Sequence, residues 1–235
     1  NKKDLSKLKK LINFSRKNKK ITACLIKNNT LQAKRKISQS QPKLKEKYIT
    51  RAFFIENFLK SVNKKTKIIS STGYLSRELY SKIQKLKLSI NPFYLVGGMG
   101  HTSIVSLGYA LESKKQIICL DGDGSFLMHM GSAVSVGKYS KKNFKYILLN
   151  NKSHESVGGQ STNIEKMNLE LFSKSVGYNK YFYLDQKNMS LSTIKAFLKS
   201  TGPSFLEVNI KIDKSENKLP RPKDLLKVKK NFLKK

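Results

Sequence analysis

The feature that most constrains this fold is a regular alternation of short apolar runs with segments of helical period, between about Thr50 and Ile212. The apolar runs of strand length cover 67–70, 93–96, 116–120, 145–149, 181–184 and 205–210. The segments of helical period cover 52–59, 76–86, 102–111, 126–139, 169–176 and 191–198. This alternation predicts a three-layer α/β domain, in which helices cover both faces of a parallel sheet.

The chain before this domain has a different character. Residues 5–13 predict a short amphipathic helix, and the apolar run 21–26 predicts a strand in which Cys24 is buried. Polarity then rises sharply, so residues 28–49 are expected to form a linker. Because the first residue is Asn1 rather than Met, we expect a fragment or a processed chain.

The predicted domain spans 50–212, and Cys119 is expected to lie buried within one of its strands. The basic tail at 213–235 carries Pro220 and Pro222, which predict an extended segment before a short last helix.

The chain is strongly basic, with a formal net charge of +33. Such a charge can indicate nucleic acid binding, but only five of the 48 basic residues are arginine, the residue favoured for bidentate contacts to bases. We therefore do not expect a nucleic acid partner, although the charge would attract a small anionic substrate. No apolar run has the length of a membrane span and no signal peptide pattern is present, which predicts a cytoplasmic protein without membrane contact.

The most informative motif follows the run 116–120, where the chain passes through Gly122, Asp123 and Gly124 into a predicted helix. Glycines let the backbone approach a ligand, and the free amides of a first helical turn point at negative charge. An acidic residue there would repel a bare phosphate, so Asp123 predicts a divalent cation between them, and hard oxygen ligands favour Mg²⁺. The amide oxygens of Asn150 and Asn151, at the end of the next strand, would reach the same place. The helix is expected to present one apolar face, formed by Phe126, Met130, Ala133, Val134 and Gly137.

Two further loops at strand ends carry candidate ligand contacts. The sequence VGGMG at 96–100 places Met99 between glycines, where either core packing or a cofactor contact would explain it. The sequence SSTGYLSREL at 70–79 offers Thr72 and Gly73 as phosphate contacts, and a helix cap is the alternative for Thr72.

The chain has three histidines. His154 follows the asparagine pair and is the first candidate for binding a substrate anion or relaying a proton, with His101 as the second. His129 is expected to be structural. Arg77 could bind an anionic substrate group bidentately, and an exposed helix position is the alternative.

Longer strings carry a family resemblance. SSTGYLSRELY, FYLVGGMGHTS, CLDGDGSFLMHMGS and LLNNKSHESVGGQST, with LPRPKDL near the end, together resemble the phosphonopyruvate decarboxylases, which depend on thiamine diphosphate. The resemblance runs from about Thr50 to Leu225, and more faintly from Ile21. The related sulfopyruvate decarboxylases share the GDG pattern but usually carry other residues in place of NNKSHES, so they are the second candidate.

The resemblance implies thiamine diphosphate and Mg²⁺ as cofactors. By that likeness Asp123, the side chain of Asn151 and the backbone carbonyl of Ser153 would hold Mg²⁺. The backbone amides of Gly124 and Ser125 would bind the diphosphate.

The same resemblance implies roles around the organic part of the cofactor. Met99 would support the cofactor in a bent conformation, and the carbonyl of Gly97 would accept a hydrogen bond from its aminopyrimidine. The reaction implied is the decarboxylation of 3-phosphonopyruvate to phosphonoacetaldehyde and carbon dioxide in phosphonate biosynthesis, in which the cofactor carries the chemistry.

The resemblance also implies a missing partner, because the glutamate that activates the cofactor belongs to a separate pyrimidine-binding domain. Residues 1–27 would be a remnant of that domain. Either the chain is a fragment, or it is one subunit of a two-chain enzyme, as in some sulfopyruvate decarboxylases. In both cases we expect an oligomer, either homomeric or heteromeric, and no activity from this chain alone.

A hypothesis of another class remains, a basic module without enzymatic activity that binds nucleotides or nucleic acid through the GDG helix. Asn150 and Asn151 discriminate between the two, because a metal-bridged diphosphate needs such ligands and a phosphate-binding loop does not.

Overall fold

The computed structural model describes residues 2–27, 48–212 and 219–234, and the chain divides into two compact units, Asn1–Lys45 and Glu46–Lys235. In the first unit, α1 (Lys2–Asn18) contains the helix predicted at 5–13. The strand predicted at 21–26 is wrong: the segment has no regular secondary structure, and Leu25 is 97% exposed. Cys24 is likewise exposed, not buried. A strand needs a neighbouring strand for its backbone groups, and the described residues offer this segment none.

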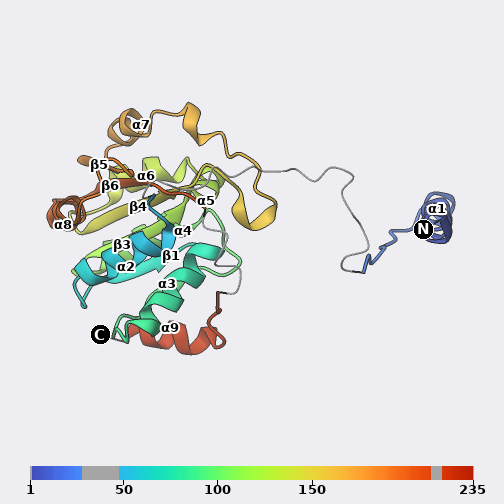
Figure 1. Cartoon of the computed structure of the whole chain (residues 1–235), viewed down its shortest axis with the longest axis horizontal. Coiled ribbons are helices and arrows are strands. Elements are labelled where there is room, and N and C mark those ends of the chain that lie inside the picture. The colour runs from blue at the N-terminus through green and yellow to red at the C-terminus, as the bar shows by residue number, and fades with distance from the viewer. Residues whose placement is uncertain (1, 28–47, 213–218, 235) are drawn as a thin grey trace. The chain divides into compact units, whose positions relative to one another are not determined.

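In the second unit, the described residues form one sheet of six parallel strands in the order β2-β1-β3-β4-β6-β5 (Figure 1). The predicted α/β fold with a parallel sheet is confirmed. The strands are β1 (Lys67–Ser70), β2 (Phe93–Tyr94), β3 (Ile117–Gly122), β4 (Phe144–Asn150), β5 (Lys180–Leu184) and β6 (Ser204–Asn209).

Helices cover both faces of this sheet, because successive residues of a strand point to opposite sides. In β3, Ile118 and Leu120 pack into one core, and Ile117 and the buried Cys119 pack into the other. The first core is closed by α2 (Arg51–Ser61), α3 (Tyr74–Lys85) and α8 (Leu191–Lys199). The second is closed by α4 (Thr102–Glu112), α5 (Asp123–Met128), α6 (Ser132–Tyr139), α7 (Leu169–Ser175) and α9 (Leu225–Leu233).

The predicted linker and tail are only partly covered by the described residues. Ile49, placed in the linker by its sequence, is buried, and its carbonyl accepts a hydrogen bond from the Lys211 N–H over 2.9 Å. The rest of the linker prediction at 28–47, and residues 213–218 of the tail, lie outside the described residues. The short last helix predicted for the tail is present as α9.

The single helix predicted at 126–139 is wrong, because two helices, α5 and α6, occupy this stretch with a break between them. The break packs closely against the loop at Gly100: a Cβ on this glycine would lie 2.5 Å from the His129 ring and 2.9 Å from the Met128 Cβ. Because the helical conformation is interrupted between the two helices, residues of α6 do not continue the apolar face of α5. Val134 is therefore 56% exposed, although its spacing from Phe126 predicted burial.

Lys145, in β4, is only 1% exposed. Its Nζ donates to the carbonyl and hydroxyl oxygens of Ser200 and to the hydroxyl of Ser204. Burial, with a smaller contribution from the charge of Lys180, lowers the pKa of the Lys145 ammonium to about 8.

This pKa predicts a pH-dependent stability. The unfolded chain has the ordinary lysine pKa of about 10.4, so it binds more protons than the folded chain above pH 8, and stability rises with pH there. Between pH 7 and 9.5 wild type should gain about 2 kcal/mol relative to Lys145→Met. Urea unfolding of both proteins at the two pH values measures this difference, and parallel curves would contradict it.

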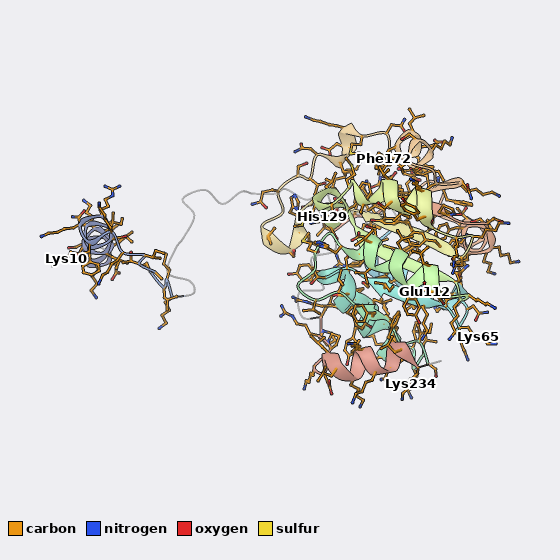
Figure 2. The ribbon with its side chains drawn as sticks, turned by 180° about the vertical axis from the view of Figure 1, so that it is seen from behind. Lys10, Lys65, Glu112, His129, Phe172 and Lys234 are labelled. Atoms are coloured by element: carbon orange, nitrogen blue, oxygen red, sulfur yellow. The ribbon has the colours of Figure 1, made fainter. Side chains whose placement is uncertain are left out.

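The two ends of the sheet are visible in Figure 2. Lys65, just before β1, lies at the amino end of the strands, whereas His129, just after α5, lies at the carboxyl end. No helix in the described ranges is both long enough and apolar enough to cross a lipid bilayer.

Candidate active site

The strand order brings three motif-bearing loops to one place. Strands β1, β3 and β4 are neighbours, so the chain segments that follow their carboxyl ends converge, as expected for ligand sites of parallel sheets. A cavity of about 320 Å³ lies there. Its wall includes most of the predicted site residues, namely Thr72, Gly73, Met99, Asp123, Gly124, Ser125, Asn151, Ser153 and His154.

Asp123, the first residue of α5, is only 4% exposed. Its Oδ2 accepts hydrogen bonds from the Ser153 N–H (3.1 Å) and the Thr162 hydroxyl (2.9 Å). Burial raises the pKa of this carboxyl above its ordinary value, and the hydrogen bonds only partly oppose the shift. A buried carboxylate served by neutral donors is electrostatically suited to take up a cation.

Asn151 brings a second oxygen to the same point. Its Oδ1 accepts from the Ser153 N–H over 3.0 Å, so this one N–H faces oxygens from the ends of two adjacent strands. The preceding residue, Lys152, has a φ of 58°, and this left-handed turn accompanies the bend that directs the Ser153 N–H inward.

These residues fit a hard divalent cation. The oxygens of Asp123 and Asn151 converge, and the buried Ser153 Oγ has no hydrogen-bond partner among the described residues. The described residues contain no cluster of three or more His, Cys, Asp or Glu side chains that could hold a metal, so one carboxylate with amide and backbone oxygens would form the ligand set. Mg²⁺ prefers oxygen ligands and keeps several of its waters or phosphate oxygens.

Because Gly124 has no side chain, His154 and Met99 can approach its backbone closely. A Cβ on Gly124 would lie 2.9 Å from the His154 Nδ1 and 3.6 Å from the Met99 Cε. The next residue, Ser125, is buried, and its Oγ accepts a hydrogen bond of 3.0 Å from the Gly100 N–H. This bond ties the loop after β2 to the first turn of α5, which positions Met99 at the cavity.

The loop after β1 contributes Thr72 and Gly73. The N-cap residue of α3 is Gly73, with a φ of 90°, and no side chain caps it, so Thr72 lines the cavity and the helix-cap alternative is not observed. Ser76 closes the turn, with its hydroxyl donating to the Gly73 carbonyl over 2.9 Å.

Three predicted residues do not line this cavity. Gly97 has a φ of 78° in the loop after β2. His101 is exposed, its Nδ1 lies 3.2 Å from the Met99 carbonyl oxygen, and its ring stands 4.2 Å from the ring of His129. The Arg77 guanidinium lies 5.2 Å from the centre of the Tyr74 ring. The alternative prediction for Arg77 was an exposed position on its helix. The residue is instead partly buried, with its guanidinium near the ring of Tyr74 in the same helix.

Two charged residues of the wall, Arg51 and Glu155, were missed by the sequence reasoning. Arg51, at the start of α2, is 6% exposed, and its Nη1 lies 2.7 Å from the Glu155 Oε2. The same carboxylate oxygen accepts from the Asn151 Nδ2 over 3.0 Å, so the ion pair holds the asparagine in orientation. The one sequence signal was that Arg51 is among only five arginines in a lysine-rich chain, which marks a site where a planar guanidinium is needed.

Comparison with known proteins identifies the class to which this fold and site belong. Residues 71–208 match the family described as "Thiamine pyrophosphate enzyme, C-terminal TPP binding domain". The chain belongs to this family, and the resemblance to thiamine-diphosphate-dependent enzymes that its motifs indicated is confirmed.

Particular relatives narrow the class. The chain is 32% identical over 174 residues to phosphonopyruvate decarboxylase of Streptomyces viridochromogenes, a match that covers 74% of this chain and 43% of that protein. It is 34% identical over 144 residues to sulfopyruvate decarboxylase subunit beta of Methanothermobacter thermautotrophicus, with 61% and 73% covered. The chain therefore spans less than half of the first relative and about three quarters of the second.

Solved structures agree in fold. The thiamine diphosphate-dependent 4-hydroxybenzoylformate decarboxylase of Rhodococcus jostii superposes with a TM-score of 0.57 at 16% identity, covering 71% of this chain and 33% of that one. The 2-oxoglutarate:ferredoxin oxidoreductase of Magnetococcus marinus gives a TM-score of 0.54 at 17% identity, with 69% and 62% covered.

Proposed function

We propose that this chain is the diphosphate- and Mg²⁺-binding part of a thiamine-diphosphate-dependent decarboxylase that converts 3-phosphonopyruvate to phosphonoacetaldehyde and carbon dioxide. One observation carries the proposal: oxygens of Asp123 and Asn151, from adjacent strand ends, converge on one N–H at the cavity. A nucleotide-binding module has no need of this second ligand, so the geometry favours the enzyme. Relatives named for decarboxylation of a 2-oxoacid with a terminal anionic group support the reaction class.

The chain's own residues would bind the cofactor in two places. Asp123, the Asn151 side chain and the Ser153 carbonyl would hold Mg²⁺, which neutralises the diphosphate. Gly124 and Ser125 would contact the diphosphate from α5. Bound thiamine diphosphate supplies the electron sink needed for loss of carbon dioxide.

Opposite this first turn of α5, Thr72 and Gly73 would contact the diphosphate from the loop after β1. Met99 would support the organic part of the cofactor, and Gly97 would accept its hydrogen bond through the backbone carbonyl.

His154 is the residue best placed to act on the substrate, because its Nδ1 lies against Gly124 at the cavity wall. It would bind the substrate's anion or hand over the proton that completes the aldehyde. His101 and Arg77 do not line the cavity, so we assign the direct contact with the substrate to His154. The buried Arg51 is the guanidinium that lines the cavity itself.

The activity is proposed for the assembled enzyme and not for this chain alone. The glutamate that activates the cofactor would come from a pyrimidine-binding domain or subunit, and the relatives named as a beta subunit support a two-chain assembly. Sulfopyruvate is the second candidate substrate, because the identities to the two groups of decarboxylases are nearly equal. A cytoplasmic location and at least a dimer complete the proposal.

Aldehyde release measures the proposed function. Phosphonopyruvate, sulfopyruvate and pyruvate are offered, with thiamine diphosphate and Mg²⁺, to this chain alone and to this chain combined with a matching pyrimidine-binding half. We expect turnover of phosphonopyruvate by the combined sample only. Faster turnover of sulfopyruvate would transfer the assignment to the second candidate, and a combined, folded sample that turned over none of the three would end the decarboxylase proposal.

A further inference from the structure

A second cavity, of about 440 Å³, lies at the β2 edge of the sheet and shares no lining residue with the first. Its walls come from the second half of α3, from the segment 90–94 that leads into β2, and from 220–231 at the end of the chain. This volume falls within the range of roughly 300–1,000 Å³ that is usual for small-molecule sites. The proposed decarboxylase function makes no use of it.

One wall of this cavity is apolar and aromatic. Tyr80 and Tyr94 meet edge to face, with ring centres 6.2 Å apart at 82°, and Ile83 and Ile90 lie beside them. Such a wall packs well against a flat ring, because aromatic rings favour edge-to-face and offset contacts with each other.

The opposite wall is cationic and comes from the C-terminal segment, with Arg221, Lys223 and Lys227. The one carboxylate among the lining residues, Asp224, is engaged as the N-cap of α9, where it accepts from the Lys227 N–H over 2.8 Å. The charges that face the cavity are therefore mainly positive, and an anionic group would be bound there.

Tyr94 adds a polar group to this aromatic wall. The residue is only 6% exposed and lines the cavity. Tyrosine hydroxyls in such positions usually find a hydrogen-bond partner, and a polar atom of a bound molecule could serve as that partner.

We propose that this second cavity binds an organic anion that carries a planar ring, the chemistry of a nucleoside diphosphate. The ring would lie against Tyr80 and Tyr94, and the phosphates would meet Arg221 and Lys227. The ligand would contact the same helix, α3, whose first residues line the cofactor cavity.

Titration calorimetry with ADP at physiological salt tests the site. Saturating thiamine diphosphate and Mg²⁺ are present throughout, which keeps ADP from the first cavity. We expect ADP to bind at least tenfold more tightly than adenosine or inorganic diphosphate, because each of these offers only one half of the chemistry.

Two double variants of the same segment separate this site from the general positive charge. Arg221→Gln with Lys227→Gln should weaken ADP binding at least tenfold. Lys229→Gln with Lys230→Gln also removes two positive charges, both from α9, but changes no residue that lines the cavity. This variant should leave the ADP affinity within twofold. Absence of ADP binding, equal losses in both variants, or diphosphate binding as tightly as ADP would overturn the proposal.

Discussion

Asp123→Ala is expected to lower the affinity for thiamine diphosphate in the presence of Mg²⁺ by at least about 100-fold, because it removes the carboxylate that we propose as a metal ligand. Among the described residues that line the cavity, the carboxylates are those of Asp123 and Glu155, and Glu155 is paired with Arg51. No other acidic group of this wall is left to hold the cation. Titration calorimetry at fixed Mg²⁺ measures the loss.

Two further variants test whether the loss of affinity in Asp123→Ala comes from the charge of this carboxylate. Asp123→Asn keeps the size and removes the charge, so it should lose most of the same affinity. Glu112→Ala removes one negative charge at the last residue of α4, which lies apart from His129 in Figure 2 and does not line the cavity, and this variant should bind normally. Thermal unfolding without ligands is recorded alongside, so that loss of binding is not mistaken for loss of structure. Undiminished affinity in Asp123→Ala would refute the assignment of this carboxylate to the metal.

Gly137→Ala is expected to destabilise the second unit by about 3 kcal/mol or more. A Cβ on Gly137 would lie 1.6 Å from the Val176 carbonyl oxygen and 2.6 Å from its carbon. Both are backbone atoms, so the overlap cannot be relieved by turning a side chain. Helix α6 would have to separate from the turn after α7, at the expense of the core between them.

Gly108→Ala is the matched control, a glycine-to-alanine change within a neighbouring helix, α4. No atom lies within 4 Å of the added Cβ, and the residue is exposed. Alanine should therefore stabilise the protein by about 0.5–1 kcal/mol, through helix propensity and a less flexible unfolded chain. Urea unfolding followed by circular dichroism measures both changes, and effects of equal sign and size would contradict the close approach at Gly137.

Several parts of the fold were available from the sequence. Strand β1 occupies the predicted 67–70. The strands predicted at 116–120 and 145–149 differ by one residue at their starts and extend to Gly122 and Asn150. Local signals suffice here, because a run that is buried on both faces is apolar throughout and the glycine turn ends it. The GDG turn, the asparagine pair and the convergence of loops beyond the carboxyl ends of parallel strands were enough to place the candidate metal ligands together.

Other features depend on contacts between distant parts of the chain. The partner of Glu155 is Arg51, 104 positions away, and no local pattern identifies that pair. Gly137 and Gly108 look alike in the sequence, and only the turn at Val176 makes them different.

The sequence by itself determined the parallel α/β fold and the family, and it predicted the candidate ligand positions, because hydrophobic period and turn chemistry act within a few residues. The tertiary structure decided that 126–139 breaks into two helices, that 21–26 forms no strand and that Arg77 stays outside the cavity. Each of these outcomes depends on which surface lies opposite, and that surface comes from residues far away in the chain.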